Sequence, residues 1–145
     1  MARYTMSVRT EMAPEDAFAY LSDLSNFDEW DPGIRRAEQV EGAGPGEGAV
    51  YELDASGTTF RYVVEQFDPP RSVTARARST ILSSVDTVTV EPDEEGPGSI
   101  VTYDADLTLN GLLRIGDPLL KLAFDRVGDR SAEGLTEKLR GRRIR

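Results

Sequence analysis

The order of strand-like and helix-like segments constrains the fold more than any other feature of this sequence. One strand pattern comes first, two short helix patterns follow, and then six strand patterns lead to a long amphipathic helix pattern. A strongly curved antiparallel sheet with one long helix across its concave face satisfies this order. A lipocalin-type barrel does not, because it lacks two helices after its first strand. We therefore predict an α+β fold: a curved seven-stranded antiparallel sheet around a long C-terminal helix, with two short helices after strand 1.

Alternation of polar and apolar residues places the strands. The predicted strands are residues 3–10, 34–41, 50–55, 59–67, 72–79, 83–91 and 100–109. The last has the clearest pattern, since Tyr103 and Ala105 alternate with Asp104 and Asp106. Residues 34–41 do not show which side faces inward, because charged and apolar residues share one parity.

Capping residues place the helices. Pro14 suits the first position of a helix, and a second short helix near residues 25–30 ends at the turn Asp31-Pro32-Gly33. Asp117 and Pro118 begin the long helix, which is predicted to continue to about Leu139. Its predicted inward face consists of Leu120, Ala123, Phe124, Val127, Ser131, Gly134 and Leu135.

Composition excludes several classes of function. The 145 residues suit one domain, 1–145, and the chain contains no Cys and no His. Disulfides, thiol chemistry and the usual zinc sites are therefore excluded, and we expect no metal and no cofactor. The net charge of -9 argues against nucleic-acid binding. No apolar run could span a membrane and the N-terminus lacks a signal-peptide pattern, so we expect a cytoplasmic protein.

Basic residues gather at the C-terminus, where residues 138–145 include five Lys or Arg and no acid. The simplest interpretation is a set of cations at a helix C-terminus, where the helix dipole favours them. The alternative is a weak contact with an anionic surface. Because residues 142–145 lie beyond the last apolar helix residue, Leu139, we expect the fold not to need them.

Several stretches together are typical of one superfamily. They are APEDAF at 13–18, LSD at 21–23, FDEWDP at 27–32, GAGPGEG at 42–48, VEQFDPPR at 64–71 and GSIVTY at 98–103, which leads to Gly111. Over nearly its whole length the chain resembles the START/Bet v 1-like (SRPBCC) helix-grip superfamily, and within it the bacterial polyketide cyclase/dehydrase-like proteins. The resemblance implies a cavity for a small hydrophobic molecule. It transfers no catalytic residue, because the family has no universal catalytic motif.

Small residues on the inward faces also predict a cavity, because interiors are close-packed and this space would otherwise be filled. These residues are Ala75, Ala77, Ala105, Ala123, Ser131 and Gly134. We expect at least about 300 Å³, reached past residues 42–48 and past Leu112, Leu113 and Ile115. The expected ligand-binding residues are Trp30, Phe60, Tyr62, Ala75, Ala77, Val88, Tyr103, Ala105, Leu112, Leu113, Leu120, Phe124, Val127 and Ser131.

Two glycine features have two interpretations each. The loop at residues 42–48 fits no phosphate-binding pattern and leads into a strand, so it is either a simple hairpin turn or a gate over the cavity. Gly134 either faces a cavity or touches the sheet in a tight core.

Four other residues also have two interpretations. Trp30 either packs at the edge of the core or stacks on a ligand. The phenols of Tyr62 and Tyr103 need hydrogen-bond partners, which are either side chains or a ligand oxygen. Asp86 shares the inward parity of Val88, yet we favour an exposed strand end that leaves it in water. A buried Asp86 would have a raised pKa and could act as an acid or base.

These observations lead to a first hypothesis, that the protein binds or carries a lipid, polyketide or aromatic metabolite. The alternative is a polyketide cyclase or dehydratase in which Tyr62, Tyr103 or Asp86 transfers protons. A third hypothesis is a protein that acts through surface contacts. The absence of His favours the first hypothesis. An all-apolar cavity would support a carrier, whereas converging Tyr, Asp and Arg groups would support an enzyme.

Overall fold

The computed structural model describes residues 2–55, 57–80, 82–109 and 117–145, without the side chains of residue 2 and of 117–124. The first part of the chain forms β1 (Ala2–Thr10), α1 (Pro14–Ser22), the 3-10 helix η1 (Leu24–Asn26) and α2 (Phe27–Trp30). The strands β2 (Ile34–Glu41), β3 (Val50–Ala55), β4 (Thr58–Asp68), β5 (Ser72–Arg78), β6 (Leu82–Pro92) and β7 (Ser99–Leu109) follow. The chain ends with α3 (Asp117–Lys138) and β8 (Arg142–Arg143).

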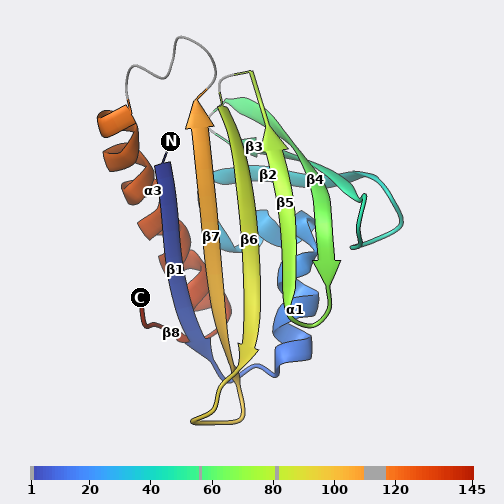
Figure 1. Cartoon of the computed structure of the whole chain (residues 1–145), viewed down its shortest axis with the longest axis vertical. Helices are drawn as coiled ribbons and strands as arrows, with labels where there is room; N and C mark the ends of the chain where they lie inside the picture. The colour runs from blue at the N-terminus through green and yellow to red at the C-terminus, as the bar shows by residue number, and fades with distance from the viewer. Residues whose placement is uncertain (1, 56, 81, 110–116) are drawn as a thin grey trace.

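The strands form one antiparallel sheet in the order β2-β3-β4-β5-β6-β7-β1-β8. Figure 1 shows that the sheet is curved, with β2 and β3 crossing behind β6 and β7 and with α3 beside β1. The predicted α+β fold is therefore confirmed, including the two short helices after the first strand and the long C-terminal helix. The described sheet has eight strands rather than seven, because β8 adds a short pair to the free edge of β1.

One half of the interior is solid. Helix α1 begins at Pro14, as predicted, and packs its buried side chains Ala17, Phe18 and Leu21 against β5, β6 and β7. The ring of Phe18 lies 5.4 Å from that of Phe67 on β4, edge to face. This packing removes apolar surface from water and leaves little open space beneath α1.

The inward face of α3 differs from the predicted face. Gly128, Ala132, Leu135 and Leu139 are buried, whereas Val127 is 51% exposed. The helix packs against β1 and α2 through close contacts at its glycines. A Cβ on Gly134 would lie 1.8 Å from the carbonyl oxygen of Trp30. The open-space interpretation is therefore wrong, and the tight contact at this glycine is made with α2 and not, as predicted, with the sheet.

The basic C-terminus packs on the body of the protein. Arg143 donates hydrogen bonds to the Tyr4 hydroxyl at 2.9 Å and to the Asp129 carboxylate at 3.0 Å. The backbone N–H of Ile144 donates to the carbonyl of Ser7 at 2.9 Å. These contacts argue against the expectation that the fold does not need residues 142–145. No helix in the described ranges is both long enough and apolar enough to cross a membrane.

Candidate functional site

A cavity of about 360 Å³ lies between the sheet, α2 and the middle of α3. The expected cavity between sheet and long helix is therefore present, and its volume exceeds the expected minimum. Most of its described wall is apolar, and that part of the wall includes Met6, Ile34, Phe60, Leu82, Ala105 and Leu107. Ala105 and Leu107 form a small cluster of their own with Leu82 and Tyr103, apart from the main core.

Polar groups converge at one place on this wall, around Asp86. Ser84 Oγ and the Tyr103 hydroxyl both donate hydrogen bonds to its carboxylate, and the Tyr62 hydroxyl donates at 3.5 Å. Asp86 is only 6% exposed, so the favoured prediction that it stands in water is wrong. The reason is that β6 extends well past Asp86 in both directions and has β5 on one side and β7 on the other.

The surroundings of Asp86 alter its acidity. The pKa of its carboxyl is raised from 3.8 to about 6, with burial as the largest cause. The negative charge of Asp31 contributes to this rise, and the three hydroxyl donors oppose it. Burial and the adjacent carboxylate raise the pKa values of Tyr62 and Tyr103 well above 10. At neutral pH the cluster therefore consists of two protonated phenols and one ionised carboxylate whose pKa is close to physiological pH.

A second carboxyl group lines the same cavity. Asp31 follows α2, and its Oδ1 accepts a hydrogen bond from the Gly33 N–H at 2.9 Å. Burial raises the pKa of Asp31, and hydrogen bonds from Gly33 and Ser131 partly offset that rise. The turn predicted at residues 31–33 is thus present, and it also brings a carboxyl group to the cavity wall.

The residues predicted to bind a ligand are divided between several places. Those on the described cavity wall are Trp30, Phe60, Tyr62, Tyr103, Ala105, Val127 and Ser131. Leu112 and Leu113, like Ile115, lie in 110–116, outside the described residues, and Leu120 and Phe124 belong to the part of α3 whose side chains are not described.

Ala75, Ala77 and Val88 are buried but are not among the residues that line the cavity. The small strand residues accommodate side chains from the helices instead of leaving open space. Leu21 and Leu24 extend from α1 and η1 into this region, and a void of only about 10 Å³ remains beside Ala75 and Val88. These three predicted residues therefore lie outside the described wall of the cavity.

Ser84 and Asp31 are among the polar wall residues that were not predicted from the sequence. Ser84 has the same strand parity as Asp86, so extending the inward face of this strand by two residues would have found it. In the sequence, Asp31 is recognisable only as a residue of the turn at 31–33. Its position at the cavity depends on how α2 packs against α3.

The interpretations of Trp30 and of the glycine-rich loop can now be separated. Trp30 is 3% exposed, its ring meets those of Phe27 at 4.8 Å and Tyr103 at 5.8 Å, and it also lines the cavity, so it is a core residue at the cavity edge.

The loop at residues 42–48 folds onto Gln39, whose amide donates to the Gly44 carbonyl and accepts from the Gly44 N–H. None of its residues lines the described cavity, so the hairpin interpretation holds and the gate interpretation does not.

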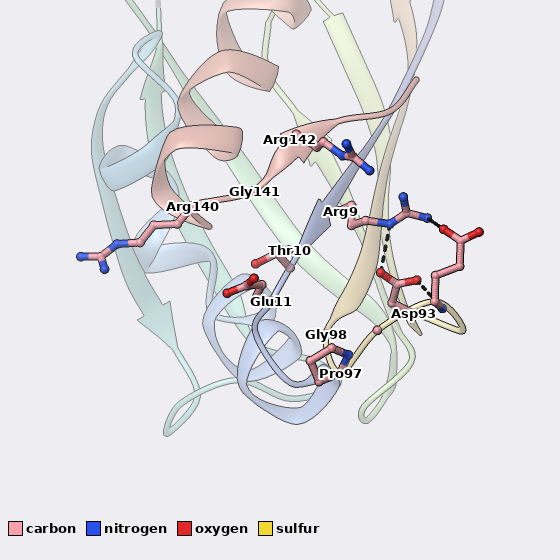
Figure 2. A pocket seen from close by; sticks show the side chains of 11 residues that line it. Arg9, Thr10, Glu11, Asp93, Pro97, Gly98, Arg140, Gly141 and Arg142 are labelled. Atoms are coloured by element: carbon pink, nitrogen blue, oxygen red, sulfur yellow. Dashed lines mark hydrogen bonds and ion pairs between the residues drawn. The ribbon is translucent and has the colours of Figure 1, made fainter.

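A second pocket, of about 430 Å³, lies on the surface where β1, the turn after β6 and the end of α3 meet (Figure 2). Its Arg9 forms ion pairs with Asp93 at 2.9 Å and Glu95 at 3.1 Å. Figure 2 shows Arg140 and Arg142 extending in different directions. This pocket therefore lacks a set of converging cations that could hold an anion, and the internal cavity is the better candidate.

The comparisons with known proteins agree with the fold. The family model described as "Polyketide cyclase / dehydrase and lipid transport" matches residues 1–140. No curated protein has a significant match to this sequence.

Solved structures resemble the chain over nearly its full length. A START superfamily protein from Mycobacterium smegmatis has a TM-score of 0.79 at 15% identity, with 97% of this chain and 98% of that one covered. The XoxI protein from Bacillus cereus has a TM-score of 0.74 at 20% identity, with 96% of each chain covered. Major latex-like protein 151 from Panax ginseng has a TM-score of 0.60 at 16% identity, covering 89% of this chain and 97% of that one. At these identities the likeness establishes the fold and not the ligand.

Proposed function

Because this chain belongs to the polyketide cyclase/dehydrase and lipid transport family, of the START/Bet v 1-like superfamily, we propose that it binds a small hydrophobic or amphipathic molecule in its cavity. The ligand class includes lipids, polyketides and aromatic metabolites. One observation carries the proposal: the described wall of a cavity of about 360 Å³ is mostly apolar, and polar side chains converge on it around Asp86.

The division of the wall suits an amphipathic ligand. An apolar body would contact side chains such as Phe60 and Leu107, and burying it contributes roughly 25 cal/mol per Å² removed from water. A polar end would lie near Asp86 and Tyr103, which would fix its orientation. The cavity volume is within the usual range for small-molecule sites, about 300–1,000 Å³.

Two alanine variants test this proposal with the neutral fluorescent probe N-phenyl-1-naphthylamine. Ala105→Leu places a larger side chain in the cavity, so it should leave thermal stability nearly unchanged and weaken probe binding at least about fivefold. Ala77→Leu is the matched control in the solid half, where Ala77 is 0% exposed, and overpacking should cost about 1–3 kcal/mol. Normal probe binding by a folded Ala105→Leu variant would overturn the proposal.

A second candidate function is catalysis of proton transfer, as in a cyclase or dehydratase. The observation that favours it is the convergence of Asp86, Tyr62 and Tyr103, with the pKa of Asp86 raised to about 6. The Asp86 carboxylate would remove a proton from a carbon next to a carbonyl group. The electrons of that C–H bond would pass to the carbonyl oxygen, and a phenol would donate a hydrogen bond to the resulting enolate.

Hydrogen–deuterium exchange into 1-phenylbutane-1,3-dione, measured by NMR in D₂O, tests the catalytic candidate. The wild-type protein should accelerate exchange at the carbon between the two carbonyls, and Asp86→Asn should not. Equal exchange rates with the two proteins would leave binding as the only function proposed for this cavity.

A further inference from the structure

The internal cavity has negative charges that no described cation offsets. Asp31 and Asp86 line it, and none of the described lining residues is Lys or Arg. The sequence contains no His that could supply a positive charge. Arg143 contacts the hydroxyl of Tyr4, a wall residue, but Arg143 is itself paired with Asp129 at 3.0 Å. A ligand with an anionic end would therefore meet repulsion at the polar part of the wall.

The hydroxyl groups around Asp86 present acceptors to a ligand. Ser84, Tyr62 and Tyr103 all direct their hydroxyl hydrogens at the carboxylate of Asp86. The oxygen atoms of these hydroxyl groups can still accept hydrogen bonds through their lone pairs. A carboxylate has about four acceptor sites, so after three donors it can accept one more hydrogen bond. The ligand group that complements this set is one that donates hydrogen bonds and accepts none.

Aromatic rings form another part of the same wall. Trp30, Phe60, Tyr62 and Tyr103 line the cavity, and the faces of such rings carry partial negative charge that attracts a cation. Carboxylates, hydroxyl acceptors and aromatic rings all favour the same chemical group, an alkylammonium ion. Its three N–H donors and its positive charge match each of these features.

We propose that the preferred ligand of this cavity is a small hydrophobic amine, bound as its ammonium ion with the charged end at Asp86 and the apolar part along Phe60 and Leu107. This inference rests on the proposed binding function and deepens it by naming the class of ligand. It also distinguishes this cavity from one that would accept a fatty acid, whose carboxylate would lie against two others.

The raised pKa of Asp86 predicts that binding of the amine depends on pH. With a pKa of about 6, Asp86 is mostly ionised at pH 7.5 and mostly neutral at pH 5. The groups that interact with it are Asp31, Ser84, Tyr62 and Tyr103, and neither phenol ionises in this range. An alkylamine stays protonated throughout, since its pKa is similar to the value of about 10.4 for lysine. Binding of the amine should weaken as pH falls from 7.5 to 5.

The test compares three ligands with the same apolar body by isothermal titration calorimetry: 4-phenylbutylamine, 4-phenylbutan-1-ol and 4-phenylbutanoate. At pH 7.5 the amine should bind about tenfold or more tightly than the alcohol, because hydrogen bonds between ions are roughly twice as strong as neutral ones. The butanoate should bind most weakly. Asp86→Asn should weaken binding of the amine by about tenfold or more and so remove most of its advantage over the alcohol.

A control addresses the two cations whose side chains are not described, Arg114 and Lys121. In the double variant Arg114→Gln, Lys121→Gln the amine should keep its advantage over the alcohol within about threefold. A rise in amine affinity of about tenfold or more would mean that one of these cations already neutralises the carboxylates, and would overturn the inference.

The outcomes separate this inference from the function on which it rests. If the alcohol binds and the amine binds no better, the amine inference is wrong and the binding function stands. If none of the three ligands binds and the probe N-phenyl-1-naphthylamine does not bind either, the proposed function itself fails.

Discussion

Replacing Asp86 by asparagine should remove a pH-dependent loss of stability that the carboxylate causes. Burial raises the pKa of this carboxyl from 3.8 to about 6, so the folded protein holds the proton more tightly than the unfolded chain does. Stability is then greatest when the group is neutral in both states, and it falls as pH rises through this window. One pKa unit corresponds to about 1.4 kcal/mol, so the ionised carboxylate costs the folded state roughly 3 kcal/mol at neutral pH.

Part of this loss can be measured above the isoelectric point, which lies near 4.5. Between pH 5 and pH 7 the unfolding free energy of the wild type should fall by roughly 1 kcal/mol relative to that of Asp86→Asn. Urea unfolding followed by the fluorescence of Trp30, the single Trp, measures both proteins at each pH. The asparagine amide also changes the unfolding free energy by an amount that does not depend on pH. The test therefore uses the way in which the difference in unfolding free energy between the two proteins changes with pH, and not its size at one pH.

A matched control lies on the neighbouring strand. Asp104 on β7 is held by Arg3 and Thr5, and its pKa is lowered, because these hydrogen bonds and the charge of Arg3 outweigh the effect of burial. A lowered pKa gives stability that is present above the unfolded value and lost only at lower pH, below this window. Asp104→Asn should therefore differ from the wild type by a constant amount from pH 5 to pH 7. A constant gap for Asp86→Asn as well, or one of the opposite slope, would refute the assignment of Asp86 as a buried carboxyl with a raised pKa.

Three further changes have definite expected outcomes. Gly134→Ala should destabilise the protein by at least about 1–3 kcal/mol in thermal melts, because its Cβ would meet the Trp30 carbonyl. Gly96→Ala should be nearly neutral, because its Cβ would meet only Asp93 Oδ2, at an ordinary contact distance of 3.9 Å. Removing residues 142–145 should lower the melting temperature by several degrees, because β8 and the contacts of Arg143 with Tyr4 and Asp129 are lost. A shift of this size corresponds to a loss of about 1 kcal/mol of stability. Arg140→Ala should leave the melting temperature unchanged, because no described contact of that side chain is lost. Binding of N-phenyl-1-naphthylamine should be the same with and without a chelator, and a loss on chelation would show that a metal takes part.

The strands were the easiest part of the fold to predict, because the facing of a strand is encoded by a period of two. Val101 and Ala105 on β7 are buried as the alternation indicates. The same rule placed Tyr62, Tyr103 and Asp86 on inward faces. It did not show how deep Asp86 lies, since depth depends on the sheet order that puts β5 and β7 on either side of β6.

Small residues were the hardest part to interpret, because they are compatible with two opposite arrangements. Gly134, Ala75 and Ala77 were all taken to indicate space. In the structure the carbonyl group of Trp30 packs closely against Gly134, and the two alanines lie in the solid half of the interior. Ala105 does border the cavity. Only the positions of α1 and α2 distinguish these cases, and no local pattern contains that information.

The Asp86 cluster lies at the boundary between the solid and the hollow halves of the interior. Tyr62 and Asp86 line both the small void beneath α1 and the large cavity beside α3. A carboxylate at such a boundary lowers stability at neutral pH, which the packed core under α1 has to offset. The same carboxylate is the strongest polar feature available to a ligand, and a bound cation would reduce the cost of its charge. Ligand binding and the pH dependence of stability should therefore be coupled: with 4-phenylbutylamine bound, the fall in stability between pH 5 and pH 7 should shrink, and with 4-phenylbutan-1-ol it should not.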